Sequence, residues 1–134
     1  GEYISTKVNR LDGKPDAAFS GYYAFASWMV TGENRPYSIA DGEPAGRIYA
    51  KKKSLGAIEL AARISNLNLN DADADIMGGE GNNVTLAANW YPYPNLKFTA
   101  NYVLINHDEF ATGDGDYVGN DDYSVFQFGF YYSF

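Results

Sequence analysis

Hydrophobic and polar residues alternate at intervals of two along several segments of this chain. Residues two apart in a β-strand point to the same face, so each such segment predicts a strand with one apolar side. The clearest segment is 124–134, whose opposite face is mostly small or polar and whose aromatic face carries Phe126, Phe128, Phe130, Tyr132 and Phe134. This pattern predicts a strand that faces hydrocarbon on one side and water on the other.

The same pattern predicts six strands, at 2–8, 19–31, 55–67, 83–91, 96–105 and 124–134. Segment 55–67 also contains good helix formers, but its strict alternation favours a strand. Three further aromatic residues continue the apolar faces and are expected to face lipid: Trp28, Trp90 and Tyr102. Consecutive strands of about ten residues with one apolar side are typical of transmembrane barrels. The predicted fold class is therefore all-β, an antiparallel transmembrane β-barrel meander.

The predicted connections differ in length and in charge. A tight turn is expected at 92–95, where proline should end the strand, and acidic loops are expected at 9–18, 68–82 and 106–123. The three loops hold twelve of the 17 acidic residues, and we expect them outside the cell, where barrels carry their long loops. The connector at 32–54 would then be periplasmic. It holds five of the 10 basic residues. Because it is long, we expect it to be functional or to pack against the rest of the protein, and one possibility is that it folds into the lumen.

Composition supports a barrel more than a soluble domain. Aromatic residues make up 16% of the 134 residues, and the net charge of −7 argues against a nucleic-acid partner. The absence of cysteine excludes disulfides and thiolate metal sites. Neither a transmembrane helix nor a signal peptide is readable, so we expect a mature segment or a fragment. Residues 1–134 are predicted to form part of one barrel without separate domains.

The sequence contains no readable catalytic or metal-binding constellation. His107 is the single histidine and has no partner that would suggest zinc or a hydrolytic triad. The run Asp71, Asp73, Asp75 lacks the glycine and glutamate that a calcium-binding loop needs. We therefore expect no enzyme activity, no cofactor and no bound metal.

Four stretches resemble the C-terminal part of the phosphate-selective porin O and P family: GYYAFASWMVTGENRPYS (21–38), GAIELAARISNLNLND (56–71), NNVTLAANWYPYPNLKFTANYV (82–103) and VFQFGFYYSF (125–134). The resemblance implies a homotrimeric porin of the outer membrane of a Gram-negative bacterium, with roughly sixteen strands around an aqueous channel. This chain would supply about six C-terminal strands, and missing sequence or other chains would complete the wall, because an open edge in lipid is costly. The implied partners are outer-membrane lipid, lipopolysaccharide and small anions.

The resemblance also implies a site, because in this family basic residues on the lumen wall and on inward-folded segments attract phosphate or other anions. The candidates carried over are the connector residues and two residues at predicted water-facing strand positions: Arg47, Lys51, Lys52, Lys53, Arg63 and Lys97. The three adjacent lysines alternate in direction, so they cannot all face a lumen, and a solvated basic rim is the alternative. Arg63 shares its face with Glu59, which leaves open whether it contacts anions or pairs with a carboxylate.

The sequence therefore favours a channel through which small, phosphate-like anions diffuse. One alternative is a soluble, acidic β-sandwich that binds carbohydrate through its aromatic side chains. Another is an outer-membrane barrel with a structural or adhesive role. A sandwich would cover the aromatic faces with a second layer, whereas a barrel would leave them exposed.

Overall fold

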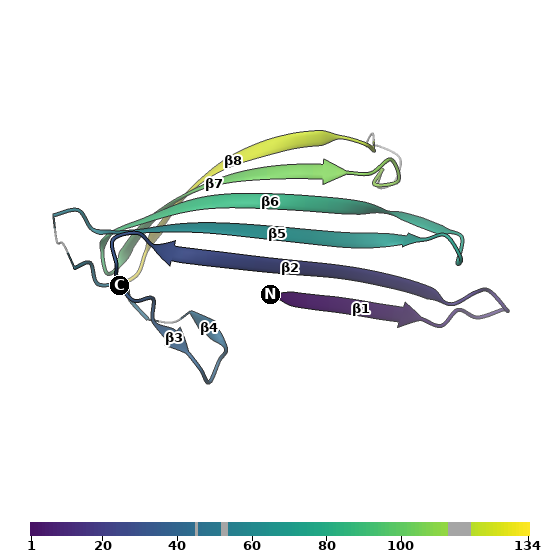
Figure 1. The fold of residues 1–134 in the computed structure, drawn as a ribbon, viewed down its shortest axis with the longest axis horizontal. Helices are drawn as coiled ribbons and strands as arrows, with labels where there is room; N and C mark the ends of the chain where they lie inside the picture. Colours follow the sequence, from purple (N-terminus) through teal and green to yellow (C-terminus); the bar gives the residue numbers. More distant parts are fainter. Residues whose placement is uncertain (45, 52–53, 113–118) are drawn as a thin grey trace. The chain divides into compact units, whose positions relative to one another are not determined.

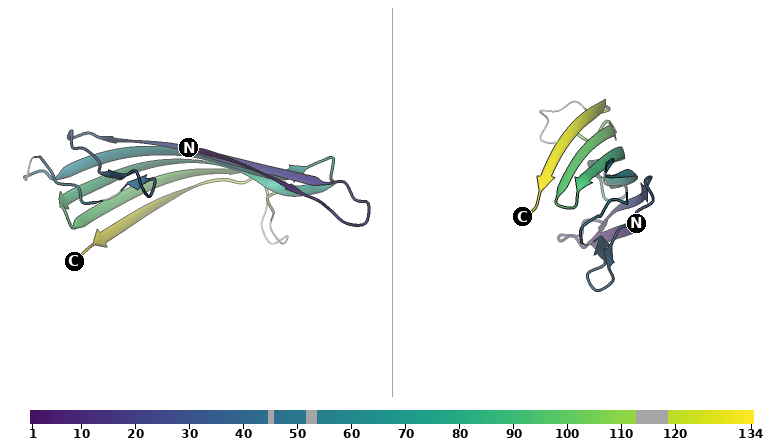
Figure 2. Two further views of the ribbon diagram at one scale, coloured as in Figure 1. Left: turned by 90° about the horizontal axis from the view of Figure 1, so that it is seen from below. Right: turned by 90° about the vertical axis from the view of Figure 1, so that its left-hand side faces the viewer.

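The computed structural model describes residues 1–44, 46–51, 54–112 and 119–134, and its regular elements are all strands (Figure 1). The long strands are β1 (Glu2–Val8), β2 (Ala17–Met29), β5 (Ala57–Asp71), β6 (Ile76–Tyr93), β7 (Leu96–His107) and β8 (Asp122–Tyr132). They form one six-stranded antiparallel sheet in the order of the sequence, which the other two views also show (Figure 2). The prediction of an all-β meander is confirmed. In the described part of the chain, no helix is long and apolar enough to cross a membrane.

The first pair of strands shows how the register follows the sequence. β1 pairs with β2 from Glu2, opposite Tyr23, to Val8, opposite Ala17. Within this sheet β1 and β8 each have one neighbouring strand, so each has an outer edge. Backbone groups on such an edge need a further strand wherever hydrocarbon surrounds them.

The chain forms two compact units, and β2, β5, β6, β7 and β8 contribute residues to both. The first unit consists of Gly1–Phe25, Arg63–Thr85 and Val103–Val125, and the second of Ala26–Ala62, Leu86–Tyr102 and Phe126–Phe134. The hydrophobic cluster of the second unit is small: Met29, Ile48, Ala57 and Tyr91 are buried, and Ala50 packs against them. Most large apolar side chains of the described residues are exposed instead, as in a single layer of strands without a cover.

The prediction of an acidic loop at 68–82 is wrong. β5 continues to Asp71 and β6 begins at Ile76, so only residues 72–75 form a turn. Polar side chains in this stretch bond across the strand pair: the Asn66 amide donates to Glu80 at 2.6 Å, and the Asn68 amide donates to Glu80 at 3.2 Å. Cross-strand pairs of this kind stabilise a sheet, so asparagine and glycine content did not mark a loop here.

Two other predicted connections also differ from the structure. β6 runs through Pro92 to Tyr93, and the turn to β7 is limited to residues 94 and 95. A proline is tolerated in a strand where its missing N–H is not needed by the ladder. The connector contains a second, two-stranded sheet of β3 (Tyr37–Ser38) and β4 (Glu43–Pro44), in which Tyr37 pairs with Pro44.

Gly79 allows the backbone of Ala111 to lie close to β6 within the first unit. Its φ is +92°, and an added Cβ would lie 2.6 Å from the Cα atom of Ala111. Gly79→Ala is expected to lower the free energy of unfolding by more than about 2 kcal/mol, because the cost of a left-handed backbone adds to that of overpacking. Urea titration of the protein, followed by circular dichroism, would measure the change.

Gly13 provides the control for that variant. Its φ is +69°, but nothing lies within 4 Å of an added Cβ. Gly13→Ala is therefore expected to lower the free energy of unfolding by about 1 kcal/mol, the cost of the left-handed backbone alone. Equal losses in the two variants would contradict the role given to the contact with Ala111.

Candidate functional site

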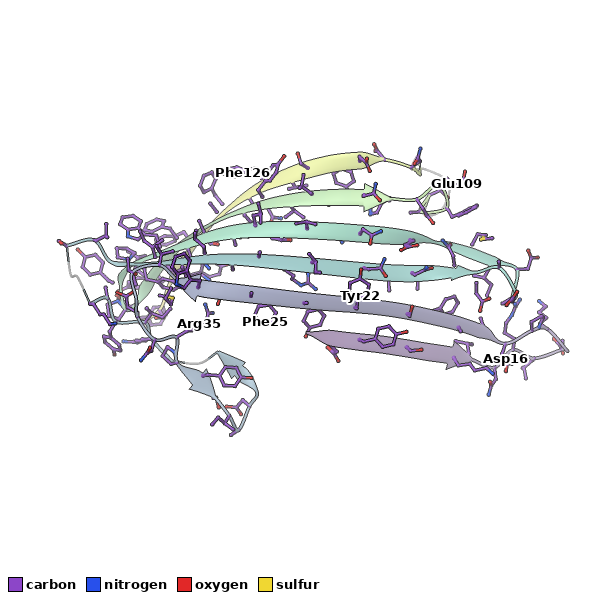
Figure 3. The ribbon with its side chains drawn as sticks, in the orientation of Figure 1. Asp16, Tyr22, Phe25, Arg35, Glu109 and Phe126 are labelled. Carbon is purple, nitrogen blue, oxygen red and sulfur yellow. The ribbon has the colours of Figure 1, made fainter. Side chains whose placement is uncertain are left out.

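A buried carboxylate on β5 holds the connector against the strands of the second unit. The Glu59 side chain is fully buried and forms an ion pair with the guanidinium of Arg35. Arg35 follows β2 in the connector (Figure 3). The other carboxylate oxygen of Glu59 accepts hydrogen bonds from the Tyr91 hydroxyl at 2.8 Å and the Asn89 amide at 3.0 Å, both on β6. A buried charge needs such partners, because its desolvation is otherwise uncompensated.

Glu33 makes further contacts that fix the path of the connector. Its carboxylate accepts a hydrogen bond from the Thr31 hydroxyl and another from the backbone N–H of Lys51 at 2.9 Å. These two donors hold the pKa of Glu33 below its usual range. The Thr31 oxygen also accepts the N–H of Ile58 at 3.0 Å, which joins this segment to the start of β5.

The connector, the turn after β6 and the end of β8 line a partly open cavity of about 410 Å³, which we call the basic pocket. Its basic lining residues are Arg35, Arg47 and Lys97, and no acidic side chain of the described residues lines it. The Lys97 ammonium lies 4.6 Å from the centre of the Tyr131 ring, a cation–π distance. Since Arg35 is neutralised by Glu59, the charge that the pocket offers to an anion comes from Arg47 and Lys97.

The structure separates the six basic residues that the sequence proposed as a group. Arg47 and Lys97 line the basic pocket, whereas the Lys51 amine donates to the carbonyl of Gly32. Arg63 belongs to the first unit, where its guanidinium lies 5.0 Å from the centre of the Tyr23 ring. Lys52 and Lys53 lie outside the described residues.

Sequence reasoning missed Arg35 and the pair that it forms with Glu59. The signal in the sequence was Glu59 itself, which lies among apolar and small residues of a strand. A carboxylate buried in such surroundings requires a cation nearby. Arg63 was weighed for that role because it shares the face of Glu59. The residue that pairs with Glu59 is Arg35, which is separated from it by 24 positions along the chain.

The eight aromatic residues predicted to face lipid are exposed, each by at least 41%: Trp28, Trp90, Tyr102, Phe126, Phe128, Phe130, Tyr132 and Phe134. Figure 3 shows the Phe126 side chain projecting from β8. Phe98 joins the rings of adjacent strands, since its centre lies 5.5 Å from that of Trp90 and 5.4 Å from that of Phe130. Such rings form a continuous apolar surface on one side of the second unit.

Acidic side chains of the first unit serve as local caps. Asp71 accepts the backbone N–H of Ala18 at 2.7 Å and that of Ala74 at 3.2 Å. Partial burial favours a higher pKa of Asp108, but its carboxylate accepts hydrogen bonds from the Asn70 amide and from the backbone N–H groups of Phe110 and Ala111, and the net effect is a lowered pKa. These carboxylates stabilise turns and strand ends.

Comparison with known proteins connects this arrangement to one family. The model of the family described as phosphate-selective porin O and P matches residues 1–134. Porin O of Pseudomonas aeruginosa is 28% identical over 127 residues, which cover 89% of this chain and 29% of that protein. An uncharacterized protein of Caulobacter vibrioides is 31% identical over 109 residues, which cover 76% of this chain and 21% of that protein. The chain thus spans less than a third of either relative, and no solved structure shows significant similarity to it.

Proposed function

Since the chain belongs to the phosphate-selective porin O and P family of outer-membrane proteins of Gram-negative bacteria, we propose that it forms part of the wall of a diffusion channel for small anions. The observation that carries this proposal is the basic pocket, in which Arg47 and Lys97 line one cavity of the second unit. The family consists of channels rather than enzymes, and diffusion needs no covalent step.

The aromatic surface supports a position in the membrane. Exposed rings at alternate strand positions lie on one face of the sheet, where they suit contact with hydrocarbon. The indole N–H of Trp90 donates a hydrogen bond to the carbonyl of Leu55 at 2.8 Å. Tryptophan in membrane proteins favours the boundary between hydrocarbon and water, where the ring is buried and the N–H is bonded. We propose that these rings face lipid, with lipopolysaccharide on the outer leaflet, and that further strands complete the wall.

The opposite side would border water. Glu59, Asn89 and Tyr91 lie there, and the connector packs against them, so the connector would narrow the channel. Two unit charges 4 Å apart interact by about 1 kcal/mol in water and about 4 kcal/mol near a protein surface, so a narrow passage strengthens the attraction of an anion to a lysine or arginine. Phosphate is the solute that the family description suggests, and a homotrimer is the assembly that we propose.

Charge reversal at the pocket tests this function. Arg47→Glu and Lys97→Glu are each expected to reduce the anion-over-cation permeability ratio by about fivefold, since a change of about 1 kcal/mol at the constriction has that effect. The ratio is measured as the reversal potential of the full-length protein in a planar bilayer across a KCl gradient.

Lys14→Glu makes the same charge change in the connection between β1 and β2 and does not line the pocket. We expect it to leave the ratio within about twofold of the unmodified protein, because exposed charges are screened over about 8 Å at physiological salt. Cation preference of the unmodified protein, or equal effects of Lys14→Glu and Lys97→Glu, would exclude the proposed anion channel.

A further inference from the structure

We propose that the basic pocket binds aromatic carboxylates, so that the channel takes up organic anions with a ring in preference to small anions of the same charge. This inference rests on the proposed function, because the pocket must be reached from the channel. It depends on the volume of the pocket, on its apolar walls and on the position of its two available cations.

The cavity is large for a small inorganic anion. Its volume of about 410 Å³ lies within the range of about 300–1,000 Å³ that is usual for sites of organic ligands. A phosphate ion would leave most of this space to water and would touch few of the lining side chains. A benzoate-sized ligand could contact an apolar wall and a cation at the same time.

The walls of the cavity are largely apolar. Pro36 and Ile48 from the connector, Tyr91 from β6 and Leu96 at the start of β7 contribute to the lining. Ile48 and Tyr91 are buried and belong to the hydrophobic cluster, so this part of the wall is fixed before a ligand arrives. A site that binds only small inorganic anions would not need these apolar side chains, whereas the ring of an organic ligand is stabilised by contact with them.

The two available cations, Arg47 and Lys97, line the same cavity. Lys97 is held over the Tyr131 ring, so its ammonium lies beside an aromatic side chain of the same pocket. Arg47 contributes a planar guanidinium, which can bind both oxygens of a carboxylate. We assign the carboxylate to Lys97 and Arg47, and the ring to Tyr131 and the apolar wall.

The test compares benzoate with acetate, which has the same charge and no ring. In a planar bilayer with the full-length protein, benzoate should reduce the chloride current with a half-saturating concentration about tenfold below that of acetate. Tyr131→Ser should narrow this preference to about twofold, because the ring loses its stacking partner. Lys97→Gln should raise both half-saturating concentrations by several-fold.

Tyr49→Ser is the matched control, since Tyr49 is an exposed tyrosine of the same connector that does not line the pocket. It should leave the preference for benzoate as it is, and circular dichroism of each variant would verify folding. Equal half-saturation by benzoate and acetate in an anion-selective channel would overturn this inference alone. An undiminished benzoate preference in Tyr131→Ser, unchanged half-saturating concentrations in Lys97→Gln, or tighter binding of glucose 6-phosphate than of benzoate would overturn it as well. Selectivity for cations would instead contradict the proposed function as an anion channel.

Discussion

Replacing Glu59 with alanine is expected to release the connector from β5 and to lower the free energy of unfolding by about 3 kcal/mol. The substitution leaves the guanidinium of Arg35 without its partner and removes the acceptor of the Tyr91 hydroxyl and the Asn89 amide. Breaking a buried pair costs about 3–5 kcal/mol, and the lower end applies because the Arg35 side chain is 36% exposed. Urea titration of the full-length protein in detergent micelles would measure the loss.

A double-mutant cycle would assign the loss to this pair. Arg35→Ala and Glu59→Ala together should cost at least about 1 kcal/mol less than the sum of the single variants, since they share one interaction. The exposed pair of Lys7 and Asp16, 3.0 Å apart with side chains exposed by 66% and 39%, is the control. Lys7→Ala should cost no more than about 1 kcal/mol. A loss in Glu59→Ala as small as that in Lys7→Ala would show that Glu59 does not hold the connector.

Alternation along the chain was sufficient to predict the six long strands, but not β3 and β4 in the connector. The predicted strand at 2–8 coincides with β1, and all six long strands pair in the order expected of a meander. Side-chain period is a local property, so it can be read from a single sequence. The prediction of exposed aromatic positions in β8 followed from the same period, and the structure leaves Phe126, Phe128 and Phe130 uncovered.

The ends of the strands and the path of the connector could not be predicted in the same way. β5 and β6 extend beyond their apolar stretches because Asn66, Asn68 and Glu80 bond to one another, and such partners are unknown until the register is known. The connector is held by Arg35 and Glu59, which pair across 24 positions. The basic pocket depends on that path, so sequence alone proposed Arg47 and Lys97 without showing that they share a cavity.

A lysine on the aromatic face of β8 is expected to impair insertion into a bilayer. Phe128 is near the middle of β8 and is 79% exposed, so Phe128→Lys would place an ammonium in hydrocarbon if this face meets lipid. The expected loss of folding free energy is about 2–4 kcal/mol at the bilayer midplane. Equilibrium folding of the full-length protein into phospholipid vesicles, followed by tryptophan fluorescence in urea, would measure it.

Gln127→Lys introduces the same charge one residue earlier, on the opposite face of the same strand. If that face borders water, the ammonium stays hydrated, and we expect a loss below about 1 kcal/mol. Both variants add one positive charge to the same strand, one position apart. Loss of the β-propensity of phenylalanine accounts for at most about 1 kcal/mol, so a larger difference between the two variants reports the medium on each side. Similar losses in both would mean that the two faces of β8 meet the same medium, and then neither the lipid contact of the aromatic face nor a channel on the other side could stand.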